Sequence, residues 1–147
     1  MDVLSLLEHQ IDRARIVVRR ELSLELPLVR GNGNRLQQVF FNLILNARDA
    51  MPSGGWLTLR TEADGDTVIV EVKDTGHGIR REDIKRIYDP FFTTKGTSRG
   101  TGLGLSVSYG IVQEHGGGIF VDSAPGTGTT FQVALPAMAE LEEAARK

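Results

Sequence analysis

The chain has 147 residues, which fits one domain with enough length to bury most of its apolar surface. Its net charge of −2 gives no reason to expect binding to nucleic acid or to anionic membranes, and the absence of cysteine excludes disulfides and thiolate metal sites. No stretch is long enough to span a membrane and no signal peptide is visible. We therefore expect a cytoplasmic chain, whose parent protein is either soluble or membrane-anchored.

The first third of the chain predicts a helix, a strand and a long amphipathic helix. Apolar residues at helical spacing indicate a short helix over residues 2–14, and the β-rich stretch after it indicates a strand that ends at Pro27. Residues 35–51 show the strongest helical pattern of the chain, with one apolar face and a stop at Pro52.

The rest of the chain alternates strand pairs with helices. In chain order, we predict a hairpin over 56–62 and 67–74, a short helix over 81–89, a second long helix over 103–117, and a closing hairpin over 119–123 and 129–136. Because consecutive strands pair as hairpins, the fold class is α/β (α+β): a two-layer sandwich with a mixed, mainly antiparallel sheet of about five strands and about three helices on one face. The domain is expected to span residues 1–136, and residues 137–147 form a tail that is either helical or disordered.

The stretch RGTGLGLSVSYG, residues 99–110, is a glycine-rich loop that runs into a helix. It lacks the lysine of a Walker loop, and Val107 stands where a dinucleotide fingerprint has its third glycine. Glycines allow backbone N–H groups to approach an anion, and a helix beginning near Leu103 directs its positive end toward that anion. The loop alone indicates either a phosphate site without a lysine or a turn without a ligand.

Two asparagines lie one helical turn apart in the first long helix. Asn42 and Asn46 share one stripe, with Asp49 close by and offset from the apolar face. Neutral oxygen ligands suit a hard cation such as Mg²⁺ that already carries phosphate oxygens. The alternative is that an asparagine only bonds to nearby backbone.

Asp74 ends the apolar strand VIVEV and precedes a turn that contains Gly76 and Gly78. A carboxylate at this position can accept a hydrogen bond from an exocyclic amine, and the glycines allow a flat ring to lie close to the backbone. Asp-Gly turns are also frequent without any ligand.

Four stretches occur in the order that is typical of sensor histidine kinases. NRLQQVFFNLILNARDA resembles the N box, DTGHGI the G1 box, YDPFF the F box and GTGLGL the G2 box, while GTGTTFQVALP resembles the closing strand of the same module. The resemblance covers about residues 3–136, and YDPFFTTK and NARDAM look most like the nitrogen-regulation type. It implies the Bergerat ATP-binding fold and an ATP-dependent protein-histidine kinase domain.

The resemblance also implies roles for single residues. Asn46 would ligate Mg²⁺ and Asn42 would line the phosphate site, while Asp74 would bind the adenine amino group beside Gly76 and Gly78. Thr129 would reach the adenine end. The complete ATP-binding set implied in this way is Asn42, Asn46, Asp49, Asp74, Gly76, Gly78, Ile79, Tyr88, Phe91, Lys95, Arg99, Gly100, Thr101, Gly102, Leu103, Gly104, Leu105 and Thr129.

Residues 93–102 would form a mobile lid over the phosphates, which Phe91 and Phe92 would anchor by packing. Lys95 and Arg99 are the basic candidates for phosphate contact. Mg²⁺, backbone amides and the helix end would then neutralise the triphosphate without a Walker lysine.

None of the three histidines, His9, His77 and His115, lies in a phosphoacceptor motif. We therefore expect a monomeric domain that binds ATP and Mg²⁺ without phosphorylating itself. Its partner would be the dimerisation and histidine phosphoacceptor domain of the same parent kinase, with a response regulator acting indirectly. Two alternatives stay open: an ATPase of the same fold, which would have a glutamate where this chain has Asn42, and a nucleotide-sensing module without phosphotransfer.

Overall fold

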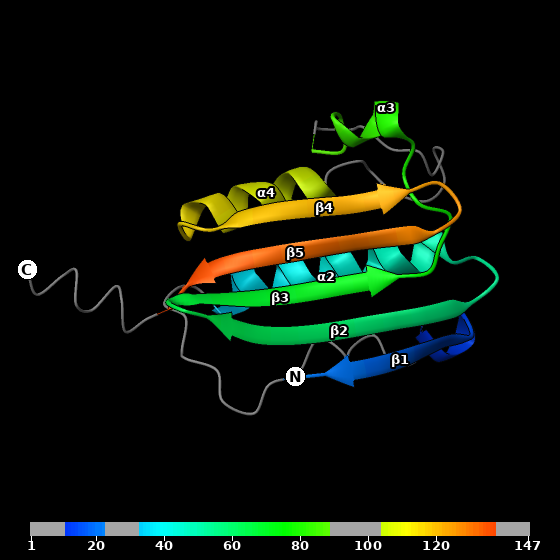
Figure 1. Ribbon diagram of the computed structural model, residues 1–147, viewed down its shortest axis with the longest axis horizontal. Helices are drawn as coiled ribbons and strands as arrows, with labels where there is room; N and C mark the ends of the chain where they lie inside the picture. Colours follow the sequence, from blue (N-terminus) through cyan, green and yellow to red (C-terminus); the bar gives the residue numbers. More distant parts are fainter. Residues whose placement is uncertain (1–10, 23–32, 89–103, 138–147) are drawn as a thin grey trace, which may run out of the picture.

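The computed structural model describes residues 11–22, 33–88 and 104–137. Five strands in this part of the chain form one sheet in the order β1-β2-β3-β5-β4 (Figure 1). The strands are β1 Ile16–Glu21, β2 Gly55–Asp64, β3 Thr67–Asp74, β4 Gly118–Ala124 and β5 Gly128–Pro136. β1 and β2 are parallel and the other pairs are antiparallel, so the predicted mixed, mainly antiparallel sheet is confirmed.

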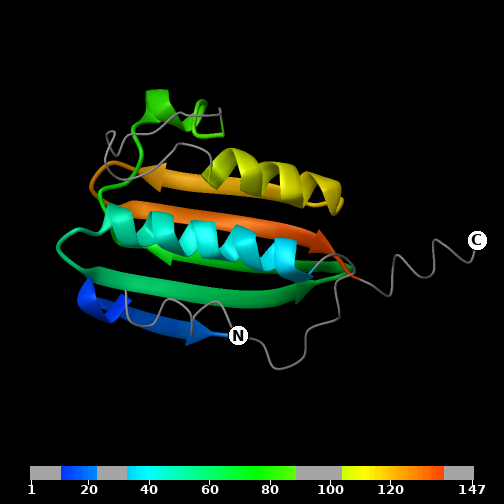
Figure 2. The ribbon, with the colours of Figure 1, turned by 180° about the vertical axis from the view of Figure 1, so that it is seen from behind.

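Two long helices, α2 (Gly33–Ala50) and α4 (Gly104–Glu114), cover the same face of the sheet (Figure 2). The predicted helix over 81–89 is shorter in the structure: α3 is the single turn Arg81–Ile84, and it lies beyond the β4 edge (Figure 1). Of the predicted helix over 2–14, the structure describes residues 11–14, of which 11–13 are helical and 14 is in a turn. β1 ends at Glu21, before the expected Pro27, which lies outside the described residues.

The core lies between this sheet face and the two long helices. α2 turns Val39, Leu43 and Ala47 inward at four-residue spacing, and each is at most 2% exposed. They meet the mainly apolar residues on the inward face of the sheet, such as the pair Val72 and Phe131 on β3 and β5. Burial of this one helix stripe against the sheet therefore supplies most of the hydrophobic stabilisation of α2.

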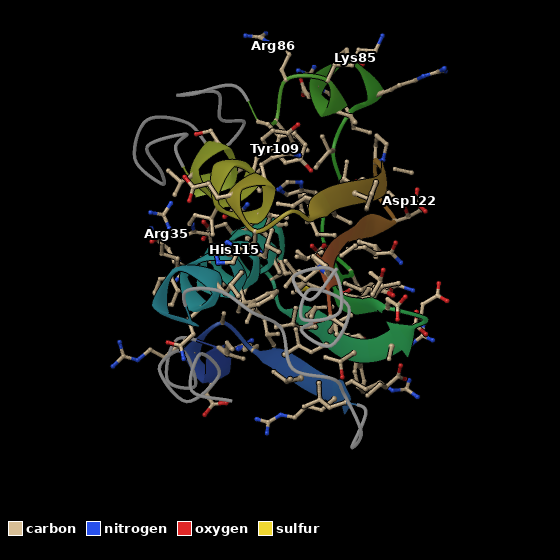
Figure 3. All side chains as sticks on the ribbon, turned by 90° about the vertical axis from the view of Figure 1, so that its left-hand side faces the viewer. Arg35, Lys85, Arg86, Tyr109, His115 and Asp122 are labelled. Atoms are coloured by element: carbon tan, nitrogen blue, oxygen red, sulfur yellow. The ribbon has the colours of Figure 1, made fainter. Side chains whose placement is uncertain are left out.

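An ion pair joins the two long helices at the end of the layer away from the turn after β3. Arg35 in the first turns of α2 lies beside the end of α4 (Figure 3), and its Nη2 is 2.8 Å from Oε2 of Glu114. Both side chains are about half exposed, so the pair adds little to the stability of the domain.

Ala137 is the last described residue, and it is buried with its N–H 2.7 Å from the carbonyl oxygen of Asp66. Ala137 therefore packs with the rest of the domain. The remainder of the predicted tail lies outside the described residues.

We predict that Leu43→Ala lowers the free energy of unfolding by about 2–5 kcal/mol. The Leu43 side chain is only 1% exposed, so its removal leaves a cavity in the core. Val107→Ala is the matched control, because Val107 is also helical but 39% exposed, and its effect should stay within about 0.5 kcal/mol. Urea denaturation of both variants measures the difference. Equal losses would show that α2 is not packed as described.

Candidate functional site

Three polar side chains lie in one row across the sheet, at the end of its helix-covered face. Asp74 on β3 is paired with Thr129 on β5, and Thr129 is paired with Ser123 on β4. Asp74 and Thr129 are only 4% and 5% exposed. The next row toward the core is apolar and consists of Val72, Phe131 and Val121. The polar row therefore marks the point where the apolar core ends.

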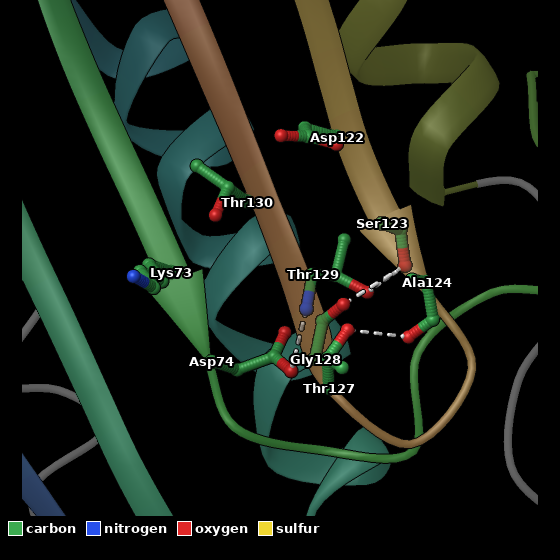
Figure 4. Close-up of a pocket in the computed structure, with 9 residues that line it drawn as sticks. All are labelled: Lys73, Asp74, Asp122, Ser123, Ala124, Thr127, Gly128, Thr129 and Thr130. Carbon is green, nitrogen blue, oxygen red and sulfur yellow. Dashed lines mark hydrogen bonds between the residues drawn. The ribbon is translucent and has the colours of Figure 1, made fainter.

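Asp74 is held in this row by backbone donors. Its Oδ1 accepts a hydrogen bond from the N–H of Gly76 at 2.8 Å. It also accepts one from the N–H of Thr129 at 3.3 Å, which Figure 4 shows. Within the described residues, Oδ2 has no hydrogen-bond partner. Burial raises the pKa of this carboxyl above its ordinary value, while the two N–H groups and the nearby His77 act in the opposite direction.

The turn after β3 packs backbone against backbone. A Cβ on Gly76 would lie 2.3 Å from the carbonyl oxygen of Ala50, at the end of α2. Gly78 has a φ of +75°, and a Cβ there would lie 2.1 Å from the carbonyl oxygen of Ala124, at the end of β4. The need for glycine at both positions therefore arises from packing within the domain itself, before any ligand is considered.

Asn42 connects the two long helices. Its amide nitrogen donates to the carbonyl oxygen of Gly104 and to Oγ of Ser108, both at 3.2 Å, and Ser108 is fully buried. Gly104 opens α4, so the asparagine positions the first turn of that helix. A Cβ on Gly104 would meet Asn42 at ordinary contact distance.

Asn46 and Asp49 continue the same side of α2 toward the turn after β3. The helix ends at Ala50, whose carbonyl oxygen accepts the N–H of His77 at 3.0 Å. Asp49 pairs with Arg48 at 3.0 Å. From Asn42 to Ala50 the helix rises by about 12 Å, so α2 joins the start of α4 to the Asp74 turn.

Three further residues of the predicted set lie against the core. Ile79, Tyr88 and Leu105 are partly buried and pack on the apolar cluster. The Tyr88 ring lies 5.1 Å from that of Tyr109, centroid to centroid, and its hydroxyl is the one buried side-chain oxygen or nitrogen of the described residues without a hydrogen bond. Burial raises the pKa of Tyr88 to about 12. Tyr88 thus has a packing role in the described part of the chain.

The structure brings Asp74, Gly76, Gly78, Ile79 and Thr129 together at one end of α2, and Asn42 and Gly104 together further along it. The other predicted residues lie outside the described residues: Phe91, Lys95, Arg99, Gly100, Thr101, Gly102 and Leu103. Phe92 and the rest of the predicted lid also lie there.

Sequence reasoning missed Ser123 and Ser108. Ser123 follows Ile119 and Val121 at alternating positions of β4. A polar residue at a strand position that points inward could have indicated it from the sequence. Ser108 stands on the apolar side of α4, again as a polar residue in a buried position. The Arg80–Asp83 ion pair at 2.9 Å, which supports α3, was missed as well.

A family model described as histidine kinase-, DNA gyrase B- and HSP90-like ATPase matches residues 31–139 of this chain. The match covers most of the chain, and the chain belongs to this family.

The chain is similar to sensor kinases within the family. Sensor kinase CckA of Brucella abortus is 44% identical over 79% of this chain and 14% of that protein, and sporulation kinase E of Bacillus subtilis is 41% identical over 97% of this chain and 19% of that protein. The chain thus spans less than a fifth of these two relatives. It is the ATP-binding catalytic domain of a sensor histidine kinase, as the four boxes predicted.

Solved structures agree with this assignment. The catalytic domain of histidine kinase ThkA is 34% identical and superposes with a TM-score of 0.81, covering 92% of this chain and 90% of that one. ThkA in complex with the response regulator TrrA gives a TM-score of 0.79 at 31% identity, over 95% of this chain and 39% of that one. The predicted Bergerat fold is confirmed. Among the described residues, no helix is long and apolar enough to cross a membrane.

We predict that Gly78→Ala destabilises the domain by about 3 kcal/mol or more, because it adds a clash with the Ala124 carbonyl to the strain of a positive φ. Gly126→Ala is the matched control: its φ is +80°, but a Cβ there meets open space, so only the strain of about 1–2 kcal/mol remains. Thermal and urea unfolding compare the two. Similar losses would contradict the backbone packing of the turn.

We also predict a difference in pH dependence between the unmodified chain and Asp74→Asn. The pKa of Asp74 is higher in the folded state than in the unfolded state. At pH values between these two pKa values, the folded state binds a proton that the unfolded state does not. The unmodified chain should therefore gain stability relative to Asp74→Asn as the pH falls from 7 toward 4. Urea unfolding across this range measures the gain, and parallel curves would contradict it.

Proposed function

We propose that this domain binds ATP with Mg²⁺ and transfers the γ-phosphate to a histidine on a separate phosphoacceptor domain of its parent kinase. One observation carries the proposal: the Asp74 carboxylate is buried, with one oxygen held by two backbone N–H groups and the other without a partner among the described residues. The second oxygen is still reached by solvent, since the Tyr88 hydroxyl is the one fully buried side-chain oxygen or nitrogen without a partner among the described residues, and the amino group of adenine is a suitable donor for it.

The adenine end of the proposed site is the polar row and the turn beside it. Asp74 binds the amino group, Thr129 lies next to it across the strand pair, and Gly76, Gly78 and Ile79 form the adjoining wall. The support for this assignment is that all five residues belong to one hydrogen-bonded corner of the sheet.

The phosphate end of the proposed site lies further along α2, toward the start of α4. Asn42, Gly104 and Leu105 line it, and the N-terminal end of α4 directs its partial positive charge there. Asn46 lies between the two ends and ligates Mg²⁺, with Asp49 one turn beyond.

The residues present fit a Mg²⁺ that arrives with the nucleotide. No group of three or more His, Asp or Glu side chains among the described residues could hold a metal ion. An amide oxygen from Asn46 adds one ligand to the phosphate oxygens without adding charge, which suits a cation that keeps most of its ligands from nucleotide and water.

The lid residues complete the proposed site over the phosphates. They are Phe91, Lys95, Arg99, Gly100, Thr101, Gly102 and Leu103. Tyr88, the last described residue before them, packs on the apolar core cluster. The motifs YDPFFTTK and NARDAM support a kinase of the nitrogen-regulation type.

The chemistry of transfer is mainly positioning and charge neutralisation, so the nucleophile is the imidazole of the partner domain. Asn42 stands where an ATPase of this fold would have its glutamate, and its amide nitrogen is already bonded to Gly104 and Ser108. An amide cannot act as a general base, which favours transfer to a partner over hydrolysis. A response regulator then receives the phosphate from the histidine domain, in the cytoplasm, where ATP is available.

The first test is calorimetric titration with ADP and a non-hydrolysable ATP analogue, with and without Mg²⁺. We expect binding to be lost, by at least about a hundredfold, in Asp74→Asn, because the amide replaces an acceptor-only group with one that also donates. Asn46→Asp should bind with an altered Mg²⁺ dependence. Asp122→Asn is the matched control, since Asp122 is exposed on the other side of β4, and it should bind like the unmodified chain.

The second test supplies the histidine domain in trans with labelled ATP. Acid-labile phosphohistidine on that domain, and none on this chain, is the expected result. Release of inorganic phosphate without transfer would instead indicate an ATPase, and nucleotide binding without either product would indicate a nucleotide-sensing module.

A further inference from the structure

We infer that Ser123 is a positioning residue that determines base selectivity, because its hydroxyl orients the hydroxyl of Thr129 so that only acceptors face the nucleotide base. The inference rests on the proposed adenine site and adds a residue and a selectivity mechanism to it. Ser123 lies in the same row as Thr129 and Asp74, on the helix-covered face of the sheet (Figure 4).

The hydroxyl of Ser123 uses all of its hydrogen-bonding capacity. It accepts the N–H of Ile79 at 2.8 Å, it donates to the carbonyl oxygen of Gly128 at 3.0 Å, and it contacts Oγ1 of Thr129 at 2.8 Å. A hydroxyl has one proton and two acceptor lone pairs. A carbonyl oxygen can only accept, so the proton of Ser123 is directed to Gly128.

It follows that Thr129 is the donor in the contact between the two hydroxyls. The Ser123 proton is used, and its remaining lone pair accepts the proton of Thr129. The Thr129 hydroxyl has no other hydrogen bond among the described residues. Its free lone pairs are therefore what it presents to a neighbouring group.

Thr129 and Asp74 are directly opposite each other on neighbouring strands, so their side chains point to the same side at close distance. A group bonded to Oδ2 of Asp74 is therefore within direct reach of Thr129. Two acceptors at this place match an exocyclic amine. They oppose a carbonyl oxygen, whose lone pairs would face those of both residues.

Ser123 also connects two backbone segments that border the proposed adenine site. Its contacts connect the turn after β3, through Ile79, to the β4–β5 hairpin, through Gly128. The same hairpin contains another hydroxyl, Thr127, which donates to the carbonyl oxygen of Ala124 at 2.9 Å but is exposed and makes no hydrogen bond with Thr129. Thr127 thus provides a control within the same hairpin.

The test compares ADP with inosine diphosphate. ADP has an amine at the purine 6-position and an acceptor at N1, whereas inosine diphosphate has a carbonyl and an N1–H donor. Calorimetry on the full chain gives both affinities. In Ser123→Ala the Thr129 hydroxyl is free to rotate and to donate to the inosine carbonyl, so the preference for ADP should fall about fivefold to tenfold. Ser123→Thr restores the hydroxyl and should restore the preference, and Thr127→Ala should leave it unchanged.

A double-variant cycle tests whether Ser123 acts through Thr129. Thr129→Val should reduce the preference for ADP by itself, and Ser123→Ala should then cause no further reduction. Circular dichroism monitors folding of each variant, and if Ser123→Ala does not fold, Ser123→Thr and Thr129→Val carry the test.

An unchanged ratio of ADP to inosine diphosphate affinity in folded Ser123→Ala, or an equal loss of both affinities, overturns the inference and leaves the proposed function standing. An unchanged ratio in Thr129→Val overturns it as well. Failure of the unmodified chain to bind ADP overturns the proposed function, and the inference with it.

Discussion

The close approach of three backbone segments at one corner of the sheet is the constraint on which the rest of the site depends. The turn after β3 touches the end of α2 at Gly76 and the end of β4 at Gly78, and Gly128 at the start of β5 leaves no room for a Cβ beside the Asp74 carbonyl. Side chains cannot fit between these segments. The backbone N–H groups of Gly76 and Thr129 are therefore brought to the Asp74 carboxylate with little freedom to move.

Holding a carboxylate at this place opposes folding. Burial disfavours the charged form of Asp74, and two backbone hydrogen bonds compensate only in part, since its pKa remains above the ordinary value. Sites that bind ligands commonly retain such unfavourable groups, because the ligand supplies the missing partner. The apolar row next to the polar one, with Val72 and Phe131, keeps water away on the core side and strengthens any hydrogen bond that Asp74 forms.

α2 has two functions that its sequence combines on different faces. One face, with Val39 and Leu43, is fully buried against the sheet and holds the layer together. The adjoining side carries Asn42, which fixes the start of α4, and ends at Ala50, which accepts the turn after β3. A single rigid helix thus sets the distance between the two ends of the proposed site. Changes in how α2 packs would alter both ends at once.

The fold class, the order of the strands along the chain and the family could be predicted from the sequence, because hydrophobic periodicity and turn residues are local signals and four boxes occur in order. The sequence also singled out Asp74, since an acidic residue at the end of an apolar strand and before glycines is a local pattern. Its prediction of a longer helix at 81–89 failed at α3, where Arg80 and Asp83 stabilise only one turn.

Which residues contact one another could be seen only in the folded domain. Ser123 and Asp74 are about fifty residues apart, and their common row depends on the pairing of β3 with β5 and of β5 with β4, which no local pattern specifies. The contact of Asn42 with Ser108 likewise depends on how α2 and α4 pack side by side. The direction of each hydrogen bond within the row follows from these contacts. A hydroxyl has only one proton to donate, and its neighbours decide which oxygen receives that proton.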